Sequence, residues 1–119
     1  MGGFRELNVW QQAKALAVEI YKLTQGASFS RDFGLRDQIR RAAVSIPSNI
    51  AEGDERGSNR DAVRFLYIAK GSLAELQTQL EIAHEIGYLE LAVLEDLNGK
   101  CAAIGKMLGS LIKVRSSHP

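Results

Sequence analysis

Apolar residues recur at alternating spacings of four and three along most of the chain, a repeat that keeps one side of a helix facing its neighbours in a left-handed bundle. Such apolar seams run through residues 9–23, 35–50, 62–87 and 94–111, with the second helix ending near Gly53 and the third starting at Ser58. No segment of useful length alternates with a period of two, so no strand is predicted. The pattern therefore predicts an all-α protein, an up-down-up-down left-handed four-helix bundle.

Helix boundaries and chain ends follow from local signals. Ser58 to Asp61 reads SNRD, which resembles a capping box at the start of the third helix. The chain has 119 residues and only two prolines, with no Ser/Gly-rich linker. This length suits one domain with its own core. We therefore expect a single domain over residues 4–115, with disordered ends at 1–3 and 116–119.

A proline interrupts the second predicted helix in the segment RRAAVSIPSNIAEG, residues 40–53. Pro47 removes a backbone N–H and costs about 3 kcal/mol in an ordinary helix interior. The seam nevertheless stays in phase, since Ile46 and Ile50 are one turn apart. We expect Pro47 to kink this helix without ending it, while Ser45, Ser48 and Asn49 bond nearby backbone groups.

A polar stripe runs beside the apolar seam of the same helix. One interpretation is a binding or recognition surface, and the other is a hydrogen-bonded helix pair that fixes the register between helices or subunits. We also expect inward or intersubunit hydrogen bonds from Asn49 and Arg41. The stripe consists of Arg41, Ser45, Asn49, Glu52 and Arg56.

Several large apolar residues lie off the seams, where an isolated bundle would expose them to water. An apolar back face of this kind is typical of a subunit interface. The sequence therefore predicts a homo-oligomer. The candidate interface residues are Trp10, Tyr21, Ile68, Ile82 and Ile86.

The net charge is only +1, but it is unevenly distributed. Residues 31–70 hold eight Lys/Arg and six Asp/Glu, whereas residues 71–99 hold six acidic residues and no basic one. Such polarity can steer a nucleic acid or dock one subunit onto another, and it is also compatible with an ordinary solvated surface. The candidate nucleic-acid band consists of Arg36, Arg40, Arg41, Arg56, Arg60 and Arg64.

Residues for catalysis or metal binding are sparse. His84 is the only histidine outside the tail, and a metal site needs further ligands on facing helices. Cys101 occupies a seam position, where a buried and inert thiol is expected. We therefore predict no catalytic residue, metal or cofactor, and a protein that is not an enzyme.

Location signals are also few. A lone cysteine and the lack of a secretory signal favour the cytoplasm. No apolar run approaches the roughly 20 residues that span a bilayer, so a membrane is not an expected partner.

Three runs carry a family resemblance: LRDQIRRAAVSIPSNIAEG, AKGSLAELQTQL and the late GYL. They resemble the 23S rRNA intervening-sequence proteins, a family of small four-helix bundles. The resemblance implies a bacterial cytosolic protein that assembles into a homopentameric ring, with no established enzymatic activity. We therefore expect a structural or adaptor oligomer that binds itself and an unidentified protein. The alternative is an accessory protein that binds RNA or DNA through the arginine band.

Accessory proteins of diversity-generating retroelements also resemble this fold. The resemblance implies binding of nucleic acid and a reverse transcriptase through a strongly basic surface. This sequence departs from that pattern, because its isoelectric point is about 7.9 and its third predicted helix is acidic.

Overall fold

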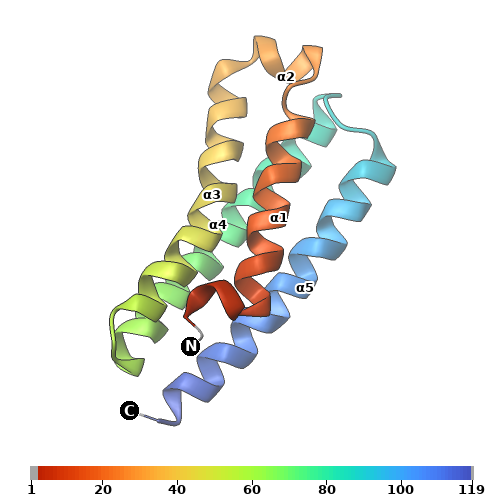
Figure 1. Cartoon of the computed structure of the whole chain (residues 1–119). Coiled ribbons are helices and arrows are strands. Elements are labelled where there is room, and N and C mark those ends of the chain that lie inside the picture. The colour runs from red at the N-terminus through yellow and green to blue at the C-terminus, as the bar shows by residue number, and fades with distance from the viewer. Residues whose placement is uncertain (1–2, 119) are drawn as a thin grey trace.

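The described part of the chain, residues 3–118 of a computed structural model, contains helices and turns but no strand (Figure 1). The elements are a 3-10 turn η1 (Phe4–Glu6), α1 (Asn8–Leu23), α2 (Ala27–Arg31), α3 (Phe33–Glu55), α4 (Asn59–Glu85) and α5 (Leu91–Ser116). The prediction of an all-α protein is confirmed. Residues 1, 2 and 119, which were predicted to be disordered, lie outside the described residues.

The described chain has five α-helices, so the prediction of four was wrong in its count. The additional helix, α2, lies in the connection between α1 and α3. It buries Phe29, whose ring meets Tyr88 edge-on with 5.2 Å between ring centroids. Asp32 follows α2 and caps α3, because its carboxylate accepts a hydrogen bond from the Leu35 N–H. A helix of five residues is too short to display a heptad pattern.

The four long helices lie side by side, and Figure 1 shows that the chain reverses direction at each connection between them. In cross-section, α1 packs against α3 and α5, and α4 packs against the same two helices, so α1 and α4 occupy opposite corners. The handedness of the bundle and its assembly into a ring stay predictions. No helix among residues 3–118 is long and apolar enough to span a membrane.

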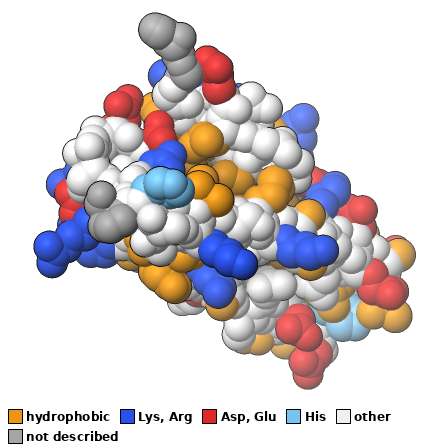
Figure 2. Space-filling model, turned by 90° about the horizontal axis from the view of Figure 1, so that it is seen from below, with side chains coloured by type: hydrophobic (Ala, Val, Ile, Leu, Met, Phe, Trp, Pro, Cys, Tyr) orange, Lys and Arg blue, Asp and Glu red, His pale blue; other side chains and the backbone are white. Residues whose placement is uncertain are grey.

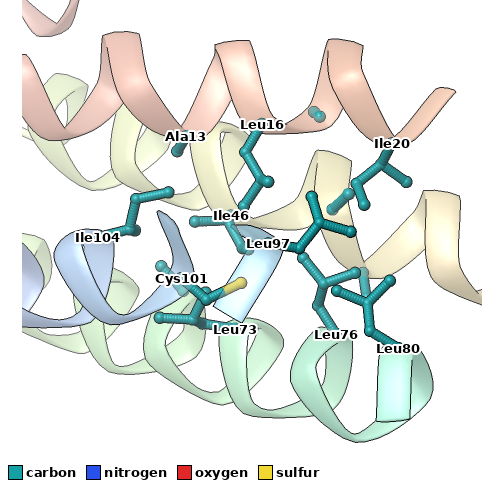
Figure 3. Close-up of a cluster of buried hydrophobic side chains, with 14 of the residues drawn as sticks. Ala13, Leu16, Ile20, Ile46, Leu73, Leu76, Leu80, Leu97, Cys101 and Ile104 are labelled. Carbon is teal, nitrogen blue, oxygen red and sulfur yellow. The ribbon is translucent and has the colours of Figure 1, made fainter. Parts of the chain in front are cut away.

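The core contains seam residues from every long helix, as Figure 3 shows. Leu16, Ile46, Leu76 and Leu97 are each at most 2% exposed. Full burial of one such side chain contributes about 1.5 to 3 kcal/mol relative to exposure. The predicted seams therefore identify the main source of the fold's stability.

Two seam assignments near helix ends were wrong. Gly87 follows α4 at a φ of 92°, a conformation that glycine adopts without strain, so it lies in a turn. On α5, Ile112 is buried whereas Leu111 is only partly buried. A straight helix drifts by about 20° per heptad, which moves the buried position by one residue towards the end of a long seam. α5 also extends to Ser116, one residue beyond the predicted limit of the domain.

Pro47 lies inside α3, and the helix continues to Glu55. The prediction that proline does not end this helix is confirmed, while the kink stays a prediction. Pro47 itself is buried. It faces α1, where it lines a surface groove together with Val18.

Candidate functional site

The polar stripe on α3 forms a hydrogen-bonded link to α4 at its centre. Ser45 Oγ lies 2.8 Å from Ser72 Oγ on α4. Asn49 Nδ2 donates to the Ser45 carbonyl at 2.8 Å and to Ser45 Oγ at 2.9 Å. Because Ser45 Oγ accepts from Asn49, its own proton is available for Ser72. This arrangement matches the helix-pairing interpretation, and the recognition interpretation stays a prediction.

The two ends of the stripe are on the surface. Arg41 is exposed, and none of the hydrogen bonds found among residues 3–118 involves its side chain, so an inward bond within the subunit is not formed. Arg56 approaches Glu52 at 3.5 Å, and both side chains are about half exposed. An exposed pair of this kind contributes at most about 1 kcal/mol.

Two arginines of the predicted nucleic-acid band, in the N-terminal half of α3, are held by intramolecular contacts. Arg36 Nε lies 3.0 Å from the Asp37 carboxylate. Arg40 Nε donates to Thr24 Oγ1 at 2.8 Å, and its guanidinium lies 4.5 Å from the centroid of the Tyr21 ring. These contacts fix the orientation of both guanidinium groups, and in Arg36 the charge is also paired with a carboxylate.

Arg41 lies beside Arg40, and the other three arginines lie near the turn between α3 and α4. Arg56 and Arg64 both approach the Phe65 ring, at 4.9 and 5.4 Å from its centroid, and Arg60 is exposed. Figure 2 shows this end of the molecule, where Lys and Arg side chains lie among acidic and apolar ones. At a rise of 1.5 Å per residue, the α3 backbone at Arg40 is about 24 Å from that at Arg56. The six arginines therefore form two groups rather than one band.

Two of the predicted interface residues lie on α1. Trp10 is partly buried against the core and meets Phe4 edge-on, with 5.1 Å between ring centroids. Lys14 Nζ lies 4.8 Å from the centroid of the Trp10 ring. Tyr21 is 42% exposed. Tyr21 is therefore more available to a partner than Trp10.

The other three predicted interface residues lie on or just after α4. Ile68, Ile82 and Ile86 are 47%, 46% and 52% exposed. A helix places residues 68, 82 and 86 close to one line along its surface. An apolar line of this kind leaves α4 with a second face that no other element covers.

An apolar groove between α1 and α3, which the sequence reasoning missed, has a volume of about 430 Å³. We call it the α1/α3 groove. Its floor is almost entirely apolar, and lysines stand at its margin. Val18 and Val44 were visible as apolar residues off the seams, but their meeting depends on how α1 and α3 align. The lining residues are Lys14, Ala17, Val18, Tyr21, Lys22, Val44 and Pro47.

The residues that could take part in catalysis or metal binding lie apart from one another. His84 Nδ1 lies 2.9 Å from the Leu89 carbonyl, so this nitrogen carries the proton and donates. Cys101 is fully buried, and desolvation raises the pKa of its thiol to about 11. Within residues 3–118, no three His, Cys, Asp or Glu side chains converge in a way that could hold a metal ion.

Two comparisons with known proteins give matches. Residues 5–110 match the family model described as 23S rRNA-intervening sequence protein. The chain is also similar to a crystal structure of a protein with unknown function from the S23 ribosomal protein family, from Bacteroides thetaiotaomicron VPI-5482. That likeness has 29% sequence identity and a TM-score of 0.82, and it covers 88% of this chain and 95% of the other. No curated protein sequence matches significantly.

Proposed function

Because this chain belongs to the 23S rRNA-intervening sequence protein family, we propose a function from its own surface: it is a non-enzymatic scaffold that assembles with copies of itself. In this proposal the four long helices form an up-down-up-down left-handed bundle. The bundles associate into a homo-oligomeric ring, which we expect to be a pentamer. The ring then presents repeated surfaces to a protein partner in the cytoplasm.

The observation that carries the proposal is the pair of apolar surfaces on different sides of one small domain. One is the α1/α3 groove, and the other is the isoleucine line on α4. Large apolar patches on small proteins mark interaction sites, because water contact with them is unfavourable. Two such surfaces on one chain suit a scaffold in which each subunit has two neighbours.

The absence of convergent chemistry among the described residues favours a scaffold over an enzyme as our proposal. His84 bonds the Leu89 carbonyl, whereas Cys101 is buried in the core, so the two side chains have separate surroundings. Nucleophilic or acid–base catalysis needs an activated group within hydrogen-bond reach of its partner. Neither residue has such a partner among residues 3–118.

Light scattering coupled to size-exclusion chromatography tests the proposed assembly. We expect particles of about five subunits at micromolar concentration, in keeping with the closed symmetry that most homo-oligomers adopt. A monodisperse monomer would refute the scaffold. A pull-down with the intact assembly, read by mass spectrometry, then identifies the partner. Binding of that partner should depend on the assembled state.

A second candidate function is association with RNA or DNA, and the observation that favours it is the arginine group at the α3–α4 turn. Arg56, Arg60 and Arg64 project from consecutive helices within one short region. One subunit would neutralise few phosphates, but a ring repeats the group, and a long strand that contacts several copies gains affinity through multivalency. We propose this role as the weaker alternative. The relation to retroelement accessory proteins also stays a prediction.

A further inference from the structure

We propose that the two apolar surfaces are complementary: Ile68 of one copy docks into the α1/α3 groove of the next copy, where Glu75 meets Lys22. This inference rests on the proposed self-assembly and specifies which residues meet in it. The occupant of the groove is a second copy of this chain.

The groove offers apolar surface that the monomer leaves in water. Val18 is 49% exposed, Val44 is 40% exposed and Tyr21 is 42% exposed. Their side chains converge on one hollow from two helices. An inserted apolar side chain would remove this area from water, at about 25 cal/mol for each Å² buried.

Ile68 has the chemistry and the placement of such an insert. On α4 it stands one turn from Phe65 and one turn from Ser72, which are both buried on the side towards α3. Ile68 itself projects outwards on that flank, and its neighbour Tyr67 is 57% exposed. Ile68 therefore forms an exposed apolar projection on the flank of α4 next to α3, while Tyr67 lies about 100° around the helix from it.

The two surfaces stand at the same level along the bundle. The bond between Ser45 and Ser72 sets the level of α3 against α4, and Val44 of the groove is adjacent to Ser45. Ile68 is one turn from Ser72, whereas Ile82 is ten residues beyond it, or about 15 Å along the helix. Rotation about the axis of a ring involves no shift along that axis, so subunits standing parallel to it meet at equal levels. This requirement selects Ile68 rather than Ile82.

Lysines stand at the margin of the groove and an acidic residue stands near Ile68, where the nearer Arg64 lies 3.9 Å from the Asp61 carboxylate. Lys14 and Lys22 stand at the margin of the groove. Glu75 lies two turns from Ile68 on the same side of α4, in a region, residues 71–99, without any Lys or Arg. Opposite charges at the margin of an apolar contact favour one orientation over others. Lys22 and Glu75 of one chain lie on helices at opposite corners, so their pairing must be between copies.

The positions of the two surfaces also allow a ring to close. The domain is a rod with extents of 46 × 21 × 20 Å, so its cross-section is nearly square. The groove lies on the α1–α3 side, and Ile68 lies on the flank of α4 next to α3. Two contact surfaces about a right angle apart, when the contact repeats, return to the first subunit after about four or five copies.

Two single-surface variants test the pairing. Val18→Glu places a carboxylate in the groove, and Ile68→Glu removes the insert. We expect each purified variant to be a folded monomer by light scattering. An equimolar mixture should give particles of two subunits, because the Ile68→Glu copy keeps an intact groove and the Val18→Glu copy keeps an intact Ile68. The second contact of such a pair would place two glutamates together, so growth stops there.

Leu91→Glu is the matched control, since Leu91 is 56% exposed at the start of α5 and belongs to neither surface. It should assemble like the wild type, with circular dichroism showing that all variants are helical. If the wild type assembles but Val18→Glu or Ile68→Glu keeps the wild-type mass, or their mixture stays monomeric, the pairing is overturned while the scaffold stands. A monomeric wild type refutes both.

A charge exchange provides a test that leaves the apolar packing untouched. Lys22→Glu and Glu75→Lys should each weaken assembly by about two- to five-fold per contact, the range of an exposed ion pair. The double variant should recover wild-type assembly, because opposite charges again meet between copies. A double variant that assembles no better than the two single variants would contradict the pairing.

Discussion

Ser45 on α3 and Ser72 on α4 join the two helices through a hydrogen bond of 2.8 Å between their hydroxyl oxygens. Two turns further along α3, a Cβ added at Gly53 would lie 2.8 Å from Phe65 Cβ and 3.2 Å from the Ala62 carbonyl oxygen. Real Cβ atoms do not approach so closely, so α3 and α4 meet at a distance that only small residues allow. Ser45 and Gly53 of the segment RRAAVSIPSNIAEG therefore serve the pairing of α3 with α4.

The serine pair predicts a measurable coupling energy. Ser45→Ala leaves the buried Ser72 hydroxyl and the Asn49 amide each short of one partner, and should lower the free energy of unfolding by about 1 to 3 kcal/mol. The double variant Ser45→Ala/Ser72→Ala should cost less than the sum of the single changes. Urea denaturation of all four proteins gives the coupling. Strict additivity would mean that the two hydroxyls do not stabilise each other.

Gly53→Ala should destabilise the protein although alanine favours helix formation. Overpacking costs about 1 to 3 kcal/mol, which exceeds the gain of up to about 1 kcal/mol from replacing a helical glycine. Gly99→Ala on α5 is the control, because a Cβ there meets nothing within 4 Å. It should raise the midpoint of thermal unfolding. Equal shifts for both variants would argue against the close approach.

The contact between Tyr88 and Asp32 predicts a change in stability at alkaline pH. The Tyr88 hydroxyl donates to Asp32 Oδ2 at 3.0 Å, and this bond raises the pKa of Tyr88 above its ordinary value. A folded-state pKa above the unfolded one gives a stabilisation that is present below about pH 10 and is lost as the pH rises through the folded-state pKa. Denaturation across this range, against Tyr88→Phe, measures the effect. A constant difference between the two proteins would contradict it.

We expect nucleic-acid binding to depend more on the arginines at the α3–α4 turn than on Arg40, which is held against the end of α1. We expect sequence-tolerant binding at low salt that is mostly lost by about 200 mM salt. Arg60→Gln should weaken it more than Arg40→Gln does, because Arg40 already bonds Thr24. Gel shifts with structured RNA and with DNA measure both. No complex at 50 mM salt and tens of micromolar protein would leave the scaffold as the sole proposal.

Much of the fold was predictable because the heptad repeat records which side of each helix is buried. Leu76 and Leu97 lie in the core as their spacing requires. The short helix around Phe29 was not predictable, since burial of one aromatic residue leaves no periodic signal. The same reasoning missed the α1/α3 groove. Val18 and Val44 are 26 positions apart, and only the alignment of two helices brings them together.

The split arginine band has a related cause. A helical wheel shows which residues share a side of a helix but not which distant residues bond them. Arg40 is held by Thr24, 16 residues earlier in the chain. Pairing at such separations is set by tertiary packing, which local spacing does not encode.

The buried Cys101 makes the wild-type chain a ready background for site-specific labelling. Thiol reagents react with the thiolate, and a thiol that is fully enclosed with a pKa of about 11 remains protonated and out of reach at neutral pH. A cysteine introduced at an exposed position would therefore be the single reactive thiol. Fluorophores or cross-linkers could then report distances between subunits without removal of the native residue.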